Sequence, residues 1–493
     1  MKRACGILLP VFSLPGNNGI GCFSKDAYQF VDFLKEAGQS WWQVLPLGPT
    51  SYGDSPYQSF STFAGNPYFI DLEDLAKEGL LKEEELAAAS APGGTIDYAA
   101  LYRSRFKVLK KAWARASDYR QKAREKFCKE NEEWLPDYAL FMALKDAHEG
   151  KAWMEWEEPI KRREKDALKA ARKKYAKEIS FYEFLQFEFH RQWKKLRKYA
   201  NGKGIRIIGD LPIYVAHDSS DVWAYPKLFQ MTDGEEPKSV AGCPPDAFSD
   251  TGQLWGNPLY DWDFHEKEGY HWWIRRMAHA FWLFDMVRID HFRGFEAYYA
   301  IPYGAKTAEK GTWEKGPGMK LFKALRKELG EKPVIAEDLG FLTKDVRKLL
   351  KQSGYPGMKV LQFAFGGPGS EYLNHRHPEN CIVYTGTHDN PTTLSWAAEL
   401  GEREKKFLLN YLDLPKDASP EKICRRLVKE ALSSPGFLAI VPLQDYLELG
   451  ADARINIPST LGGNWCWRLE GSSLTPSLAK KIKKLAKIYA RDN

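Results

Sequence analysis

Three carboxylates stand at the ends of short apolar runs in this 493-residue chain. Asp290 ends MVRID, Glu337 ends PVIAE, and Asp389 follows CIVYTGTH. Runs of this length and composition are typical of strands that are buried on both faces. When such strands lie parallel in a barrel, their carboxyl ends meet at one rim. Three acids gathered at that rim would suit the cleavage of a glycosidic bond.

The neighbours of these acids strengthen the catalytic interpretation, because a single strand-end carboxylate is as often structural as functional. Arg288 precedes Asp290 by two residues, so both side chains point to the same side of the strand. A guanidinium there would keep Asp290 ionised and oriented, as a nucleophile requires. Glu337 follows Val-Ile-Ala, and apolar surroundings would raise its pKa and suit it to act first as acid and then as base.

Eight apolar runs are predicted to be the strands that position these residues. They span residues 5–10, 41–47, 205–215, 286–292, 333–340, 359–365, 381–389 and 437–447. Helical patterns lie between most of them, as at 23–38, where apolar residues recur at helical spacing before Gly38. Alternating strands and helices predict an α/β fold, and eight repeats predict one (β/α)8 TIM barrel that spans residues 1–493.

Two insertions are predicted in this barrel. Residues 60–200, between the second and third strands, are charged and helix-forming, so we expect a mainly helical subdomain there. Residues 216–275 are rich in Trp, Tyr, Pro and Asp and show little periodicity. Long irregular segments in compact enzymes tend to carry binding residues, so we expect substrate-binding loops in this second insertion.

The composition is that of an ordinary globular protein, with 44% hydrophobic and 28% charged residues and a net charge of +7. The basic run at 161–178 would allow a nucleic-acid surface, but no nucleic-acid-binding motif accompanies it, and we interpret it as a solvated helix face. The 17 Trp, 24 Tyr and 27 Phe residues would provide stacking surfaces for sugar rings.

The cysteines and the amino terminus favour a cytoplasmic protein. Seven scattered cysteines, with no C-x-x-C pair, indicate neither a disulfide framework nor a thiolate zinc site. The first 16 residues imitate a signal peptide, but Pro10 interrupts the apolar run and no clear cleavage site follows. No run is apolar enough to predict a membrane span.

Metal and nucleotide sites are not predicted. His375 and His377 lack a third ligand at convincing spacing, so we expect them to be solvent-facing loop residues. The glycine-rich segments 16–21 and 366–369 lack the strand–loop–helix context of a nucleotide-binding fingerprint. We therefore expect no cofactor and no metal.

Long motifs show a resemblance to a known family. DLPIYV, RIDHFRGF, VIAEDLG and GTHDN, in this order on a (β/α)8 pattern, resemble the α-amylase clan. The start GILLPVFSLPGNNGIGCF and the segments at 51–72, 242–262 and 452–469 are similar more narrowly to the 4-α-glucanotransferases of glycoside hydrolase family seventy-seven, also called amylomaltases. The resemblance covers residues 4–470.

The resemblance implies roles for individual residues. Asp290 would be the nucleophile, Glu337 the acid/base, and Asp389 the carboxylate that stabilises the distorted sugar. The residues implied to bind substrate are Arg288, His291, His388, Asp210, Tyr57, Trp255, Phe248 and Asn257. Tyr57 would stack near the −1 subsite, and the loop 242–258 with Trp255 and Phe248 would cover the acceptor side.

The implied activity is the retaining transfer of an α-1,4-glucan segment to the 4-OH of an acceptor glucan, in starch or glycogen metabolism. The partners would be maltooligosaccharides rather than nucleic acid or membranes, and the chain would be a monomer or weak homo-oligomer. Two alternatives stay open. One is an α-glucan hydrolase with the same triad, and the other is a non-catalytic glucan-binding protein, which would have no use for an acid/base pair.

Overall fold

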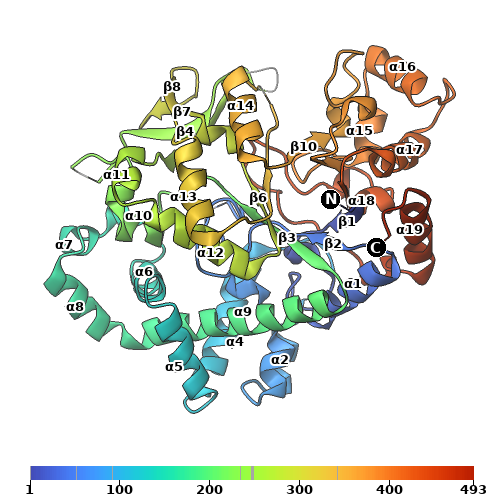
Figure 1. Ribbon diagram of the computed structural model, residues 1–493. Coiled ribbons are helices and arrows are strands. Elements are labelled where there is room, and N and C mark those ends of the chain that lie inside the picture. The colour runs from blue at the N-terminus through green and yellow to red at the C-terminus, as the bar shows by residue number, and fades with distance from the viewer. Residues whose placement is uncertain are drawn as a thin grey trace.

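The computed structural model describes residues 2–51, 53–91, 93–233, 235–245, 249–340 and 342–492. At its centre lies an eight-stranded sheet whose neighbours pair in parallel, in the order β10-β11-β12-β1-β2-β3-β6-β9 (Figure 1). Its strands are β1 (Ala4–Leu8), β2 (Trp41–Gln43), β3 (Arg206–Leu211), β6 (Met286–Ile289), β9 (Val334–Ala336), β10 (Gly357–Val360), β11 (Cys381–Tyr384) and β12 (Leu438–Pro442). The sheet curls nearly into a closed barrel, which confirms the predicted fold class.

All eight predicted runs overlap a barrel strand, but β1 and β10 begin earlier than predicted and the strands end earlier than the apolar pattern does. β3 ends at Leu211, before Pro212, and β12 is followed directly by the short helix α18 (Leu443–Tyr446). After β6 the chain turns sharply, because His291 adopts the left-handed conformation with φ of 50°. The catalytic candidates Asp290 and Glu337 therefore lie just beyond their strands, at the rim of the barrel.

The barrel encloses its own apolar core. Its interior cluster comprises Ala4, Leu8, Trp41, Ile208, Met286, Ile335, Met358, Val360, Ile382, Tyr384, Phe437, Leu438 and Ile440. The hydroxyl of Tyr384 donates to Oε1 of Gln43 over 2.9 Å, so the polar atoms of this pair are satisfied inside the barrel. The interior is thus filled by side chains, and substrate access is confined to the rim.

The barrel closes between β9 and β10, where the described residues form no regular strand ladder. Two hydrogen bonds between described residues cross from one segment to the other. The amide of Ala336 donates to the carbonyl of Pro356 over 3.0 Å. The amide of Met358 donates to the side chain of Asp338, over 2.6 Å. A carboxylate therefore takes the place of a backbone carbonyl at this seam.

Helices surround the barrel and fill the insertions. They are α1 (Lys25–Glu36), α2 (Leu72–Lys77), α3 (Glu83–Ala88), α4 (Tyr98–Ala114), α5 (Gln121–Glu130), α6 (Leu135–Ala147), α7 (Glu158–Lys161), α8 (Lys165–Lys174), α9 (Ala176–Gly202), α10 (Ser220–Ala224), α11 (Trp262–Lys267), α12 (His271–Leu283), α13 (Met319–Leu329), α14 (Lys344–Ser353), α15 (Thr393–Glu399), α16 (Glu402–Tyr411), α17 (Pro420–Ser433), α18 and α19 (Pro476–Ile488). The predicted helix at 23–38 is α1. It is capped by Ser24, whose hydroxyl accepts the amide of Asp26, and it buries Phe30 and Leu34.

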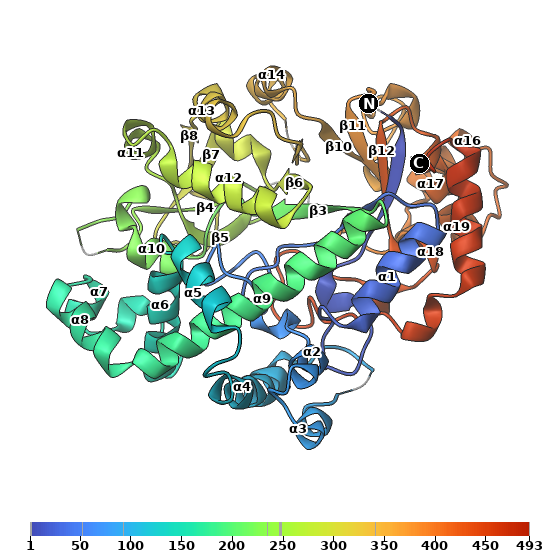
Figure 2. The ribbon, with the colours of Figure 1, turned by 60° about the horizontal axis from the view of Figure 1, so that its bottom comes forward.

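Helices α2 to α9 lie between β2 and β3. Figure 2 shows α9 as one long helix that passes between β3 and the helices α2 and α4, and it contacts β3 and α4. The side chain of Gln186 on α9 accepts from the amide of Gly65 over 2.7 Å and donates to its carbonyl over 2.9 Å. Gly65 is required there, because a Cβ would lie 2.1 Å from the ring of Phe189. Helix α9 thereby fixes one end of the segment that carries Tyr57.

We expected the second insertion, residues 216–275, to be irregular, but it contains regular helices and strands. It contains α10, α11, the start of α12, and the strands β4 (Ser239–Cys243) and β5 (Gln253–Pro258). These strands join β7 (Ala297–Pro302) and β8 (Thr312–Lys315) in an antiparallel sheet of order β5-β4-β7-β8, which lies beside α11 and α13 in Figure 1. The sequence pattern did not indicate this sheet because one partner of β4, the strand β7, is distant in sequence and Gly242 weakens the apolar signal of β4.

The two ends of the chain meet at the amino-terminal side of the barrel. The guanidinium of Arg491 is fully buried and donates to the backbone carbonyls of Ala4, Leu432, Ser434, Gly436 and Phe437. Five carbonyls at the start of β1 and before β12 thus share one cation. Burial lowers the pKa of Arg491 to about 10, so it stays charged at neutral pH. The carboxyl-terminal residues hold the strands β1 and β12 together.

Candidate active site

Strand register places Asp290 and Glu337 side by side. In the parallel pair β6–β9, Ile289 aligns with Ala336, and the next residues along each strand are the two acids. The pairing continues past the strands, because the amide of Glu337 donates to the carbonyl of Ile289 over 3.0 Å. Equivalent positions of parallel strands point to the same side of a sheet, so both carboxyl groups face the interior of the rim.

The carboxyl group of Glu337 is held by two backbone amides. The amide of His291 donates to one oxygen over 2.7 Å, and the amide of Leu339 donates to the other over 2.8 Å. Burial raises the pKa of Glu337 to about 7, and the negative charge of Asp290 adds to this rise. Arg288 and the two amides oppose the rise only in part. Glu337 is thus a fixed carboxylic acid that keeps its proton near neutral pH.

Arg288 connects Asp290 to the next strand. Its Nη2 lies 3.0 Å from Oδ1 of Asp290, and its Nη1 donates to both oxygens of Asp210, on β3, over 2.7 Å. Burial raises the pKa of Asp290 to about 6; Arg288 works against this, while Asp210 and Asp389 add to it. The ionised nucleophile expected from the sequence is therefore obtained only above about pH 6. The hydroxyl of Tyr57 completes the chain by donating to Asp210 over 2.8 Å.

Asp389 approaches from the other side of the rim. Its Oδ2 lies 3.4 Å from Nε2 of His388, and its Oδ1 accepts from the side chain of Asn456 over 2.6 Å. The ring of His388 stacks on Tyr57 with centroids 5.3 Å apart and planes at 13°. Trp465 packs against both rings, at 5.8 and 5.9 Å. Asn456 and Trp465 were not identified from the sequence, although both lie in the segment 452–469 whose motif had been noted.

Trp255 and Asn257 both lie on β5, but Trp255 packs against His291 whereas Asn257 bonds to neighbouring loops. The ring of Trp255 lies edge-on to His291 with centroids 4.8 Å apart, next to the acid pair. The side-chain amide of Asn257 is buried; it accepts from the side chain of Gln58 and donates to the carbonyl of Val215, so it joins β5 to two loops. Burial lowers the pKa of His291 to about 3, and its imidazole is neutral. Phe248 lies outside the described residues.

The histidine pair that would have allowed a metal site does not converge on one. His375 is exposed and its Nδ1 lies 3.0 Å from the hydroxyl of Tyr411. The expectation that His377 faces solvent is wrong: it is buried between the hydroxyl of Ser434 and the carbonyl of Tyr372. Within the part of the chain that the structure describes, no group of three or more His, Cys, Asp or Glu residues is arranged to hold a metal ion.

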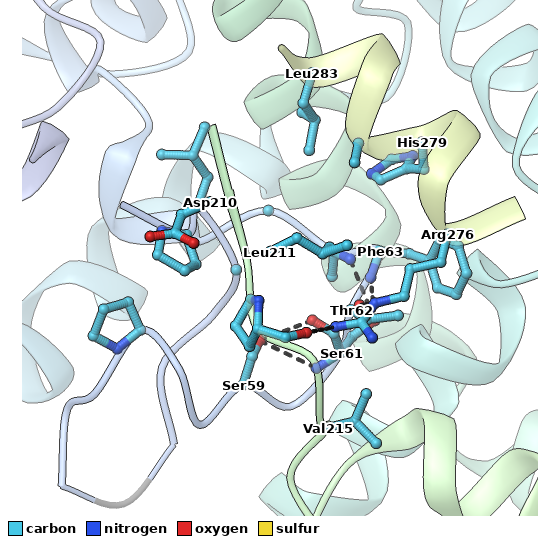
Figure 3. A pocket seen from close by; sticks show the side chains of 18 of the residues that line it. Ser59, Ser61, Thr62, Phe63, Asp210, Leu211, Val215, Arg276, His279 and Leu283 are labelled. Atoms are coloured by element: carbon cyan, nitrogen blue, oxygen red, sulfur yellow. Dashed lines mark hydrogen bonds between the residues drawn. The ribbon is translucent and has the colours of Figure 1, made fainter. Parts of the chain in front are cut away.

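A small cavity lies between the segment 46–65, the end of β3 and helix α12. Figure 3 shows it with Asp210 at one end and Arg276 and His279 near the other. Its volume of about 60 Å³ is far below the ~300–1,000 Å³ of typical ligand pockets. This cavity is therefore too small for a sugar chain, and among its lining residues are Asp210 and Tyr57 but not Asp290, Glu337 or Asp389.

The described residues also include no helix with the length and apolar character that crossing a bilayer demands.

Comparison with known proteins agrees with the geometry of the rim. Residues 9–475 match the glycoside hydrolase family described as 4-alpha-glucanotransferase. The chain belongs to this family.

Relatives share its full length. The 4-alpha-glucanotransferase of Clostridium butyricum is 47% identical, with 98% of this chain and 99% of that protein covered. That of Thermus thermophilus is 48% identical, with 100% and 99% covered. A solved structure of amylomaltase from Streptococcus agalactiae in complex with acarbose superposes with a TM-score of 0.96, at 41% identity and with full coverage of both chains. The predicted family and activity are confirmed, and the chain is a glycosyltransferase with 4-alpha-glucanotransferase activity.

Proposed function

We propose that this 4-alpha-glucanotransferase works by retaining double displacement, with Asp290 as nucleophile and Glu337 as acid/base. The observation that carries the proposal is the pair itself: two acids on adjacent strands, in register, with the pKa of Glu337 at about 7 and that of Asp290 at about 6. Between these values Asp290 is ionised while Glu337 holds a proton. Opposite protonation states of two neighbouring carboxyl groups are what this mechanism requires.

In the first step an oxygen of Asp290 attacks the anomeric carbon of the donor glucan. The glycosidic C–O bond breaks, and Glu337 gives its proton to the departing 4-oxygen. In the second step the ionised Glu337 takes the proton of an acceptor 4-OH, whose oxygen attacks the anomeric carbon and releases Asp290. Two inversions give net retention, and both carboxyl groups return to their starting states.

The other residues of the rim support this chemistry. Arg288 orients Asp290 and stabilises its charge, as the contact of 3.0 Å supports. Asp389 and His388 would bind sugar hydroxyls and stabilise the distorted ring in the −1 subsite. The stacked pair Tyr57 and His388 offers a flat wall beside that ring. Asp210 acts through Arg288, since both of its oxygens accept from that guanidinium.

Transfer instead of hydrolysis requires a bound acceptor and limited access of water. The segment 216–275 would supply the substrate-binding surface, with Trp255 above His291 on the acceptor side. Asn257 would hold this surface in place through Gln58 and Val215. The S. agalactiae relative binds acarbose, which supports α-1,4-glucans and maltooligosaccharides as ligands here.

The proposal also covers the compartment, the oligomeric state and the cofactor requirement of the enzyme. All seven cysteines are free, which supports a reducing compartment such as the cytoplasm. We further propose a monomer or weak homo-oligomer that works without a cofactor.

Incubation with maltotriose tests the function. A ladder of longer oligosaccharides together with glucose is expected from transfer. Short products alone would mean a hydrolase, and unchanged maltotriose would mean a binding protein. The variants Asp290→Asn and Glu337→Gln should each lose activity, by at least the ~10²–10⁴-fold that belongs to proton transfer in the case of Glu337. If either kept more than about a tenth of wild-type turnover, its assigned role would be wrong.

A further inference from the structure

We propose that Asp338 is a positioning residue: by closing the barrel between β9 and β10, its side chain aims the backbone amide that holds the carboxyl group of Glu337. This inference rests on the proposed role of Glu337 as acid/base and extends the site to a residue that does not touch substrate. Its basis is the seam itself, where a side chain replaces strand pairing.

The seam depends on few contacts. β9 has only three residues, and among the residues described its hydrogen bonds to the β10 segment are one between backbone groups, from Ala336 to Pro356, and one from Met358 to Asp338; Ile335 and Met358 also share the apolar core. Asp338 is 4% exposed, so the bond of 2.6 Å is shielded from water. Losing it would leave the amide of Met358 without its partner in the barrel wall.

The backbone of β10 leaves room for the carboxyl group of Asp338. At Gly357, the first residue of β10, an added Cβ would lie 2.5 Å from Oδ2 of Asp338. This glycine does not have a positive φ, so its role is to leave room and not to permit a turn. Burial raises the pKa of Asp338; Lys359 and the amide of Met358 work against this rise, and Glu371 adds to it. Lys359 in turn donates to Glu371 over 3.0 Å.

The connection to the acid/base is through one peptide group. Glu337 lies between Ala336 and Asp338, the two residues that are bonded to the β10 side of the seam. The peptide that joins Asp338 to Leu339 carries the amide that donates to Oε1 of Glu337 over 2.8 Å. Once the Asp338 side chain is fixed on β10, the orientation of this peptide is fixed as well. The second donor, the amide of His291, belongs to another strand and is independent of the seam.

Loss of the Asp338 contact therefore has a defined consequence for catalysis. The amide of Leu339 stabilises the ionised form of Glu337, so its displacement raises the pKa of that carboxyl group further. It also frees the carboxyl group to leave the position from which it transfers a proton. A displacement of about 1 Å in a catalytic group costs on the order of 100-fold in rate.

The test compares Asp338→Ala with Asp338→Asn in the full-length protein. The asparagine oxygen still accepts the amide of Met358, whereas alanine removes the acceptor. For Asp338→Ala we expect kcat on maltotriose to fall about 10- to 100-fold with little change in apparent KM, and the basic limb of the pH profile to move upward by about one unit. Asp338→Asn should restore both quantities to near the wild-type values.

Several results would overturn the proposal. Asp338→Ala with unchanged kcat and an unchanged basic limb would do so. So would a variant that loses only thermal stability, with the turnover of the folded molecules intact. If Asp338→Ala does not fold, Gly357→Ala decides by the same two readouts, since it displaces the carboxyl group from the other side. Glu337→Gln is run in parallel. If that variant stays active, the proposed function fails at Glu337; if it is inactive while Asp338→Ala is normal, only the positioning role fails.

Discussion

Replacing Glu337 by Gln should alter thermal stability in a way that depends on pH. In the folded protein the pKa of Glu337 is raised from 4.5 to about 7. A carboxyl group with a raised pKa keeps its proton in the folded state where the unfolded chain has already lost it. Its contribution to stability is therefore complete below pH 4.5 and is lost as the pH rises towards 7.

The size of this effect follows from the shift. At about 1.36 kcal/mol per pKa unit, the wild type loses about 3 kcal/mol between pH 4.5 and pH 7 through this group. Glutamine does not ionise and escapes that loss. However, both oxygens of Glu337 accept backbone amides, and the NH2 group of glutamine cannot, so the variant loses one hydrogen bond, about 1–3 kcal/mol, at every pH. We expect Glu337→Gln to be less stable than wild type at pH 5 and comparable or more stable at pH 8.

Thermal unfolding at one scan rate, followed across pH 5–8 for both proteins, measures the difference. For a chain of 493 residues, about 1 kcal/mol corresponds to about 1 °C, so the Tm of the variant should gain about 3 °C on wild type across this range. Glu371→Gln is the matched control. Arg347 and, to a lesser extent, Lys359 hold the pKa of Glu371 at about 2 despite its partial burial, so its difference from wild type should be flat between pH 5 and 8. A flat difference for Glu337→Gln as well would refute the raised pKa.

Four further outcomes are expected. The kcat/KM of wild type should be bell-shaped, falling below about pH 6 as Asp290 is protonated and above about pH 7 as Glu337 loses its proton; an activity that still rises at pH 9 would contradict this. Trp255→Ala should raise the ratio of hydrolysis to transfer and the apparent KM for added acceptor, whereas an equal loss of both activities together with a lower Tm would mean that Trp255 only packs. Asn456→Ala should lower kcat/KM about 10-fold or more without affecting folding, because a charge-assisted bond of 2.6 Å to Asp389 is lost. Arg491→Ala should cost about 3–5 kcal/mol of stability, seen as an earlier unfolding transition, while the turnover of the folded fraction stays unchanged.

The barrel strands and the acids were predictable because their signals are local. A run such as MVRID has its apolar residues and its carboxylate within a few positions, and Asp290 does lie at the end of a buried strand. The family resemblance then gave the roles of Asp290, Glu337 and Asp389, which stay proposals.

Contacts between distant segments were not predictable in the same way. Asn456 reaches Asp389 across 67 positions, and nothing in the composition of 452–469 indicates that contact. The antiparallel sheet is similar, since β4 pairs with β7 about 60 residues later. We expected His377 to face solvent because no third metal ligand accompanies it in the sequence, yet its two hydrogen bonds satisfy it inside the protein. Burial of a polar residue depends on partners that the local sequence does not show.

The closure of the chain ends by Arg491 bears on how the protein is made. β1 is synthesised long before β12, one of its two neighbours in the sheet, and Arg491, the cation that joins them, follows β12 in the sequence. At ~5–20 residues per second, synthesis of the roughly 430 residues between Leu8 and Leu438 takes about 20–90 s, and one edge of β1 stays uncovered during that time. During synthesis that open edge is an attractive surface for wrong pairing. Early pairing of β1 with β2 and burial of its free edge until β12 is made would therefore favour correct folding.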